Sequence, residues 1–225
     1  MDSDTMRARN AHEKALTAFE RGDVQILLGT QMIAKGLDFP RVTLVGVISA
    51  DTQLLLPDFR SSERTFQLLT QVAGRAGRSS LHGEVVIQTH QPNHHTLQHV
   101  VDHDVKKFYE EEMEERRELD YPPFSRIALV ETRGENEGEV QKHSEKFGRL
   151  LKGMNGGYAI LGPAPAVIAR INNRYRWHII IKSPKTKDPS GTMLRSALRA
   201  ALGAYEQAAK RSVKLIVDID PAGLM

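Results

Sequence analysis

A glutamine and two arginines near the end of the first third of the chain are spaced to lie on one face of a helix. Gln71, Arg75 and Arg78 follow one another at intervals of four and three residues, which places their side chains on the same side of a helix. Gly74 and Gly77 lie between them and let another surface approach closely. A guanidinium stays ionised and forms paired hydrogen bonds to phosphate oxygens, so the pattern favours chemistry at a phosphoryl group. A solvated basic face is the alternative, but each glycine costs a helix about 1 kcal/mol relative to alanine.

A second set of polar residues lies upstream, in a loop that follows the apolar run 24–28. Thr30, Lys35, Gly36 and Asp38 bring a hydroxyl, an ammonium and a carboxylate together around a glycine. The apolar run is typical of a buried parallel strand. Loops at the carboxyl ends of such strands bind ligands in open α/β sheets, so we expect a ligand here. An ordinary connecting loop is the alternative.

These two sets resemble motifs V and VI of superfamily 2 helicases. The first has the form Thr-x-x-x-x-Lys-Gly-x-Asp and the second the form Gln-x-x-Gly-Arg-x-x-Arg. Further segments extend the resemblance over nearly the whole chain, so that it is identified as a member of the PriA family of primosomal replication-restart DNA helicases. These segments are 58–71, 121–124, 162–165, 174–177 and 218–221.

The resemblance implies a role for each of these polar residues. Motif VI would act in catalysis at the γ-phosphate of ATP, and the implied catalytic residues are Gln71, Arg75 and Arg78. The implied nucleotide-binding residues are Gly36, Asp38, Arg75 and Arg78. Thr30 and Lys35 would touch the DNA backbone. The family's activity is ATP-dependent 3′ to 5′ unwinding, which restarts replication at stalled or branched forks.

Other parts that such a helicase needs are missing from the sequence. There is no glycine-rich phosphate loop of the form Gly-x-x-x-x-Gly-Lys-Ser/Thr and no acidic magnesium motif after a strand. The family also holds zinc with cysteines, and this chain has none. We therefore expect a carboxyl-terminal fragment that binds DNA without hydrolysing ATP by itself. ATP and Mg²⁺ would act in the complete helicase, together with the missing amino-terminal lobe, and the family implies contacts with single-strand DNA-binding protein and primosome proteins.

Positive charge is concentrated late in the chain. Residues 158–214 hold 11 Lys and Arg against 2 Asp and Glu, which predicts a polyanionic partner such as forked or single-stranded DNA. Arg170, Arg174 and Arg176 are the candidate DNA-binding residues, and a solubilising surface is the alternative. A stand-alone nucleic-acid-binding module without ATPase activity and another superfamily 2 translocase remain the alternative functions.

Apolar periodicity predicts two folded parts joined by a helix. Residues 1–95 are expected to form part of a RecA-like second helicase lobe, an α/β fold with a parallel sheet, and 96–121 a connecting helix. Residues 122–225 are expected to form a ferredoxin-like βαββαβ domain of the α+β class that contacts DNA. The predicted strands of the first part are 24–28, 42–48 and 83–89, and its helices are 10–21, 61–75 and 96–119. The predicted strands of the second are 126–132, 158–161, 167–171, 174–182 and 214–218, and its helices are 137–151 and 193–210.

Smaller features receive structural interpretations. His95, His99 and His103 share a helical spacing that could bind zinc, but surface histidines and no metal site are expected. Trp177 is expected in the core, with stacking on a base as the alternative. Asp218 and Asp220 are expected to end a strand or meet a basic neighbour. The absence of a long apolar run or signal peptide favours a cytoplasmic protein with no membrane contact, and the resemblance implies a bacterial, nucleoid-associated one.

Overall fold

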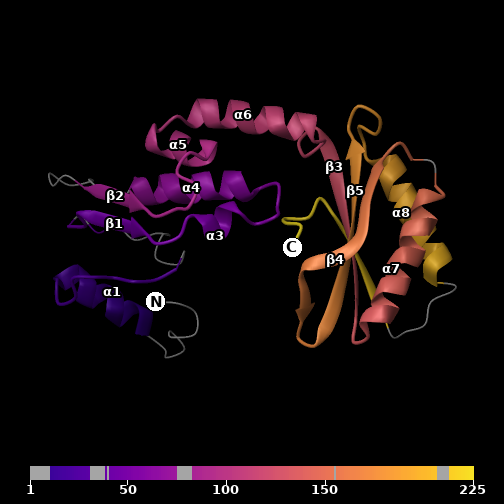
Figure 1. The fold of residues 1–225 in the computed structure, drawn as a ribbon, viewed down its shortest axis with the longest axis horizontal. Coiled ribbons are helices and arrows are strands. Elements are labelled where there is room, and N and C mark those ends of the chain that lie inside the picture. The colour runs from indigo at the N-terminus through magenta and orange to yellow at the C-terminus, as the bar shows by residue number, and fades with distance from the viewer. Residues whose placement is uncertain (1–10, 31–38, 40, 75–82, 155, 207–212) are drawn as a thin grey trace. The chain divides into compact units, whose positions relative to one another are not determined.

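The chain forms two compact units in the computed structural model (Figure 1). The structure describes residues 11–30, 39, 41–74, 83–154, 156–206 and 213–225. The first unit comprises Met1–Leu55 and Ser62–Phe108, and the second comprises Leu56–Ser61 and Tyr109–Met225. The short segment Leu56–Ser61 therefore belongs to the second unit, although its neighbours in sequence on both sides belong to the first.

The first unit contains a parallel two-stranded sheet. Strand β1 (Leu44–Val47) pairs in parallel with β2 (Glu84–Ile87), as predicted. The helical segments are α1 (Ala11–Arg21), α3 (Asp51–Leu54), α4 (Ser61–Ala73), α5 (His95–Val101) and the first turn of α6 (Val105–Glu118). This mixture of a parallel sheet with helices confirms the α/β class expected for part of a RecA-like lobe.

The core of the first unit forms between α4, α5 and the start of α6. Phe66 of α4 and Phe108 of α6 are buried and stacked, with ring centroids 4.0 Å apart. The same cluster also contains Ala50, Leu54, Leu69, Leu97 and Val100. Burial of large apolar side chains at about 1.5–3 kcal/mol each fixes α4, and with it the position of Gln71 near its end.

Two predictions for the first unit are wrong. Residues 24–28 do not form a strand, and Ile26 and Leu28 are 82% and 66% exposed. A parallel strand needs a hydrogen-bonded neighbour and cover on both faces, and within the described residues β1 and β2 pair only with each other.

The long helix predicted over 96–119 is divided into α5 and α6. The break falls at His103, which has a left-handed φ of 54°. Asp104 then starts α6, because its carboxylate accepts a hydrogen bond from the Lys107 backbone N–H at 2.9 Å. A capping aspartate after a left-handed residue starts a new helix, which periodicity alone did not reveal.

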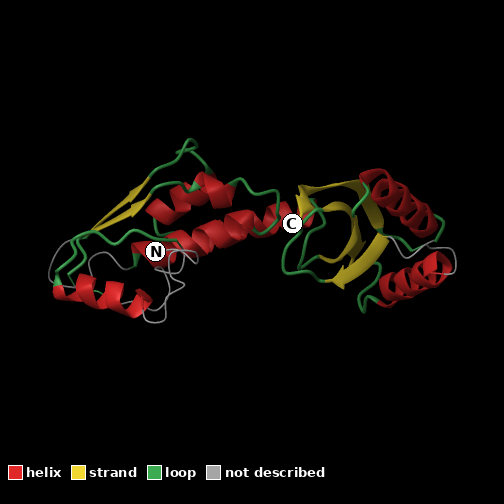
Figure 2. Ribbon diagram, turned by 90° about the horizontal axis from the view of Figure 1, so that it is seen from below, coloured by secondary structure: helices red, strands yellow, loops and turns green. Residues whose placement is uncertain are grey.

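The second unit has the predicted βαββαβ order. It consists of β3 (Ser125–Gly134), α7 (Glu137–Lys152), β4 (Ala159–Ile171), β5 (Arg174–Pro184), α8 (Thr192–Glu206) and β6 (Val213–Ile219). The strand order is β4-β5-β3-β6 with every pair antiparallel. The two helices cover one face of this sheet (Figures 1 and 2). The ferredoxin-like prediction is confirmed. Residues 207–210 of the last predicted helix lie outside the described residues.

Alternating residues of the central strands build the core beneath the helices. Val130 of β3 and Ile179 and Ile181 of β5 are fully buried against Phe147 of α7 and Leu194 of α8. Trp177 follows the same alternation but is only half-buried and stands outside this cluster, so its predicted core position is not met.

One long strand replaces two predicted strands in the second unit. The segments 158–161 and 167–171 both fall in β4, which carries register shifts against β5 between them. Asn172 and Asn173 then join β4 to β5, with φ of 50° and 60°. Positive φ at both positions of a two-residue connection is typical of a type I′ hairpin turn, so this hairpin is tight and well defined.

In the described part of the chain, none of the helices combines the length and the apolar character that crossing a bilayer requires.

Candidate functional site

The predicted nucleotide site is only partly described by the structure. Gln71 is exposed on the last turn of α4, and the helical hydrogen bonding continues to Gly74, whose N–H donates to the Thr70 carbonyl at 3.0 Å. Thr30 is also exposed. The other predicted residues of this site lie outside the described residues, and these are Lys35, Gly36, Asp38, Arg75 and Arg78. Their roles stay predictions.

Two of the predicted DNA-binding arginines lie together at the tip of the β4–β5 hairpin. Arg170 and Arg174 flank the Asn172–Asn173 turn and are exposed. The Arg170 guanidinium donates to the Asn173 side-chain oxygen at 3.2 Å and lies over the Tyr175 ring at 4.9 Å. The turn and these contacts hold the arginine at the hairpin tip, where a large ligand can reach it.

Arg176, the third predicted DNA-binding arginine, is buried instead. Its side chain is 11% exposed, and its guanidinium lies 2.6–2.7 Å from the Glu131 carboxylate of β3. Glu131 also accepts from Arg133 at 2.6 Å and lies 3.2 Å from the His178 imidazole. Paired buried charges of this kind serve the fold, because each would be costly to bury alone. The DNA role of Arg176 stays a prediction that the geometry does not favour.

The Glu131 cluster shifts two pKa values. Burial alone would raise the pKa of the Glu131 carboxyl, but hydrogen bonds from Arg176, His178 and Arg133 outweigh burial and hold it below the ordinary value. Burial lowers the pKa of His178, although the hydrogen bond with Glu131 opposes the shift. The ionised Glu131 carboxylate and the neutral His178 imidazole are therefore the forms that stabilise the fold.

Acid is expected to destabilise the second unit in two stages. A histidine with a lowered pKa contributes stability above its unfolded value of about 6.5, and this contribution is lost as the pH falls below that value, which measurements at about pH 7 and about pH 5 bracket. Glu131 adds a loss at lower pH, once its carboxylate is protonated. Thermal unfolding followed by the fluorescence of Trp177, the chain's one tryptophan, tests this. The melting temperature should fall less between these pH values in His178→Gln than in the wild type, and equal falls would contradict the assignment.

The histidine predictions are corrected in part. His99 is buried, 5% exposed, with its ring 6.3 Å from that of Phe108. His103 lies beyond the end of α5 and so does not continue the helical face of His95 and His99. The predicted surface position is therefore wrong for His99, because α5 packs this side against the core.

The carboxyl-terminal residues hold the segment Leu56–Ser61 within the second unit. The Leu224 N–H donates to the Asp58 carboxylate at 3.1 Å, and the Arg60 guanidinium donates to the Ala222 carbonyl at 2.8 Å. Phe59 stacks on Tyr121 with centroids 5.1 Å apart. The prediction that Asp220 meets a basic neighbour is confirmed, because its carboxylate lies 3.3 Å from the Arg126 guanidinium.

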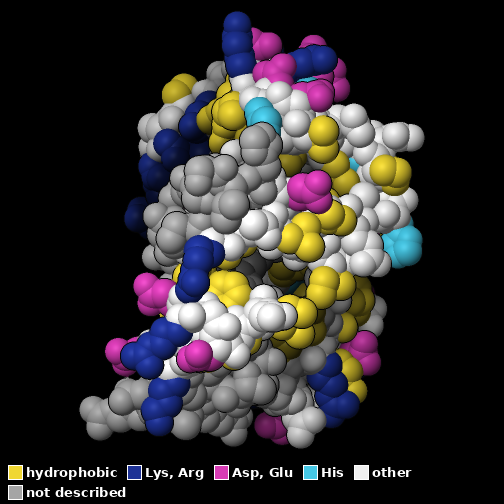
Figure 3. Space-filling model, turned by 90° about the vertical axis from the view of Figure 1, so that its left-hand side faces the viewer, with side chains coloured by type: hydrophobic (Ala, Val, Ile, Leu, Met, Phe, Trp, Pro, Cys, Tyr) yellow, Lys and Arg dark blue, Asp and Glu magenta, His cyan; other side chains and the backbone are white. Residues whose placement is uncertain are grey.

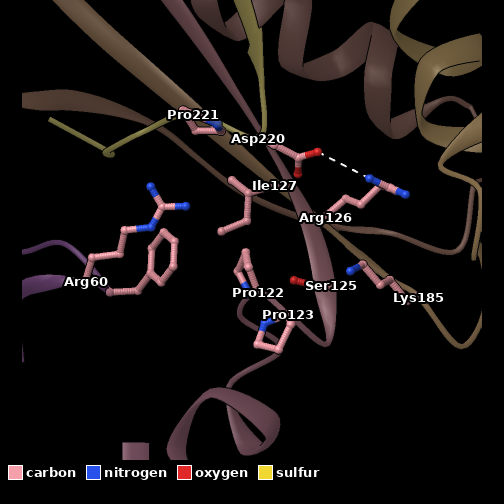
Figure 4. A pocket seen from close by; sticks show the side chains of 10 residues that line it. Arg60, Pro122, Pro123, Ser125, Arg126, Ile127, Lys185, Asp220 and Pro221 are labelled. Atoms are coloured by element: carbon pink, nitrogen blue, oxygen red, sulfur yellow. Dashed lines mark hydrogen bonds and ion pairs between the residues drawn. The ribbon is translucent and has the colours of Figure 1, made fainter. Parts of the chain in front are cut away.

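A pocket in this region was missed by the sequence analysis. It is lined by parts of the second unit far apart in sequence, including Arg60, Arg126 and Lys185 (Figure 4). Three of the family segments, 58–71, 121–124 and 218–221, contribute to its lining, but nothing in the spacing of the three basic residues placed them together.

The first unit also exposes apolar side chains. One face of the molecule shows several such side chains among charged ones (Figure 3). Besides Ile26 and Leu28, the first unit exposes 59% of Leu44, 65% of Ile48 and 56% of Val86. Single exposed apolar residues are ordinary, but several in one unit are typical of a surface that binds another segment or chain.

Comparisons with known proteins match both parts of the chain. A family model described as "Helicase conserved C-terminal domain" matches residues 3–80, and one described as "Primosomal protein N C-terminal domain" matches residues 117–222. The first match contains every predicted motif V and VI residue, and the second contains nearly all of the βαββαβ domain.

Three similar whole proteins carry the same description. The "Replication restart protein PriA" of Bacillus subtilis (strain 168) is 48% identical over 227 residues, which cover 100% of this chain and 28% of that protein. The protein of the same description from Synechocystis is 42% identical, covering 99% of this chain and 26% of the relative. The protein of the same description from Haemophilus influenzae is 35% identical, and the match covers 100% of this chain and 30% of that protein. The chain spans less than a third of the length of these relatives and corresponds to their carboxyl-terminal part.

Proposed function

We propose that this chain, which belongs to the PriA family of replication restart proteins, is the DNA-contacting carboxyl-terminal part of an ATP-dependent 3′ to 5′ helicase. The complete protein would recognise stalled or branched forks and restart replication there. The match over residues 117–222 favours this family over other superfamily 2 translocases.

The single observation that supports DNA contact best is the arginine-bearing tip of the β4–β5 hairpin. Arg170 and Arg174 are exposed there, and Val167 and Ile168 beside them are 52% and 51% exposed. Arginine binds backbone phosphates, and exposed apolar side chains beside it can contact sugars and bases. Charge supports the same conclusion, since residues 158–214 hold 11 basic against 2 acidic side chains.

The helicase activity belongs to a larger assembly in this proposal. The preceding region of the relatives would hold ATP and Mg²⁺, and this chain would add Gln71, Arg75 and Arg78 to the nucleotide. Closure of such a site on ATP and its opening after hydrolysis would move the DNA strand. The exposed apolar side chains of the first unit support a neighbouring region that covers them. Zinc in the complete protein, and contacts with single-strand DNA-binding protein and primosome proteins, are suggested by the family alone.

Removing the hairpin arginines is expected to weaken DNA binding. The double variant Arg170→Ala/Arg174→Ala should bind forked DNA roughly tenfold less tightly at moderate salt, with a salt slope shallower by about 2, because each phosphate contact contributes about 0.9. Fluorescence anisotropy at several salt concentrations measures both quantities, and ATP hydrolysis by the chain alone should be absent in the same samples.

A matched control removes two charges elsewhere in the same unit. Arg149 and Lys152 lie in the last turn of α7, and Arg149 is 72% exposed. Arg149→Ala/Lys152→Ala should leave the affinity within about twofold of the wild type, since those charges act only through the general field. Equal losses in both double variants would mean that the hairpin is no specific contact, and DNA-stimulated ATP hydrolysis by the chain alone would overturn the proposed division of labour.

A further inference from the structure

A pocket of about 250 Å³ lies in the second unit, built from five separate stretches of sequence (Figure 4). Its lining combines apolar walls with a basic rim. The apolar part comes from the segment before α4, the linker before β3, β3 itself and the end of the chain, and consists of Phe59, Pro122, Pro123, Ile127 and Pro221. The polar lining residues are Arg60, Ser125, Arg126, Lys185 and Asp220.

The rim carries excess positive charge. Arg60 lies on one side of the pocket, and Arg126 and Lys185 lie on the other (Figure 4). Asp220 is the one carboxylate in the lining, and it lies 3.3 Å from the Arg126 guanidinium. Three cations against one anion make the pocket suitable for an anionic group.

These cations keep hydrogen-bonding capacity for a ligand. The contacts of Arg126 with Asp220 and with the Pro189 carbonyl measure 3.3 and 3.4 Å, longer than the 2.7–2.9 Å usual for ionised pairs. The Lys185 side chain is exposed and has no hydrogen-bond or ion-pair partner among the residues that the structure describes. Arg60 donates to the Ala222 carbonyl, which occupies one of its five N–H groups.

We propose that this pocket binds a phosphodiester of single-stranded DNA, with Arg60, Arg126 and Lys185 around the phosphate and the proline walls against the sugar. This inference rests on the proposed DNA-binding function and adds a second contact, distinct from the β4–β5 hairpin tip. A single strand exposes sugar and base faces that apolar walls can contact, whereas a duplex presents mainly its phosphates at its surface.

Lys185→Ala tests the site without disturbing the fold, because this side chain is exposed and supports no neighbour. We expect it to reduce the affinity of the 225-residue chain for an oligo-dT of about 12 nucleotides roughly three- to tenfold, with a salt slope shallower by about 0.7. Lys187→Ala is the matched control, since Lys187 is exposed two residues away and does not line the pocket. Its effect should stay below about twofold.

Lysine footprinting gives a second readout that needs no variant. Oligo-dT should protect Lys185 from amine acetylation more strongly than Lys187, as measured by mass spectrometry. Thymidine monophosphate at the same concentration should not protect it, because a free nucleotide gains only one of the strand's contacts. Protection by the monophosphate equal to that by oligo-dT would assign the pocket to a free nucleotide and overturn the strand proposal.

The outcomes separate this inference from the proposed function. If the wild-type chain binds DNA and both lysine variants lose the same affinity, the pocket is not a site, although the DNA-binding function stands. If the wild-type chain does not bind DNA at any salt concentration, the proposed function fails, and the pocket loses its ligand with it.

Discussion

Replacing Arg78 with alanine in the full-length protein is expected to reduce DNA-stimulated ATP hydrolysis by about 10³-fold or more, while the affinity for DNA stays nearly unchanged. Arg78 follows α4, whose last described turn carries Gln71, and motif VI would direct its guanidinium to the γ-phosphate. A guanidinium that stabilises charge in the transition state acts on turnover far more than on ground-state binding. Steady-state ATPase assays at saturating forked DNA, with anisotropy for affinity, measure both effects.

Arg21→Ala provides the control for this experiment. Arg21 is an exposed arginine in the last turn of α1, in the same unit. Its removal should leave turnover within about twofold, since Arg21 belongs to neither motif and an exposed charge is screened by salt. Unchanged turnover in Arg78→Ala would remove motif VI from the mechanism, and a parallel loss of DNA affinity would move Arg78 to the DNA side of the site.

The order of strands and helices in the second unit followed from the sequence because its signals are local. Alternation in β3 and β5, the apolar faces of α7 and α8 and the Asn172–Asn173 turn each act over a few residues. The sequence did not predict that β4 is one strand, because its register shifts interrupt the alternation between Leu161 and Arg170.

The first unit was less predictable because its sheet depends on neighbours. Residues 24–28 have the composition of a buried strand, but strand formation needs a partner for the backbone, which no local pattern supplies. The break between α5 and α6 depends on one left-handed residue, His103, and on the capping carboxylate of Asp104. Both lie in a charged stretch that is compatible with a continuous helix.

The two faces of β5 show why the candidate site was only partly predictable. Alternation along β5 puts Arg176, His178 and Lys182 on the face opposite Ile179 and Ile181, and the DNA role predicted for Arg176 came from the basic charge of residues 158–214. All three residues are nevertheless only 7–9% exposed as whole residues, because groups distant in sequence pair with their side chains. Glu131 pairs with Arg176 and His178, and the Leu119 carbonyl accepts a hydrogen bond from the Lys182 ammonium at 2.8 Å. The basic pocket was missed for the same reason, since its lining comes from distant segments.

Glu131→Gln is expected to lower the free energy of unfolding of the second unit by about 3 kcal/mol or more, because it leaves charged arginine buried without its counter-ion. The Glu131 side chain is 9% exposed and the Arg176 side chain 11%, so water screens this pair weakly. Urea unfolding followed by the fluorescence of Trp177, which lies next to Arg176 on β5, reports on this unit. A loss below about 0.5 kcal/mol would mean that the pair is hydrated and contributes little.

A double variant separates the cost of an unpaired charge from the value of the pair, and it also tests the DNA role of Arg176. Glu131→Leu/Arg176→Met removes both charges and should be far more stable than Glu131→Gln, since replacing a buried ion pair with apolar residues is often nearly neutral. If Arg176 serves the fold, this variant binds forked DNA about as tightly as the wild type. A loss of affinity like that of Arg170→Ala/Arg174→Ala, in a variant that still folds, would instead show that Arg176 leaves Glu131 to contact the DNA backbone.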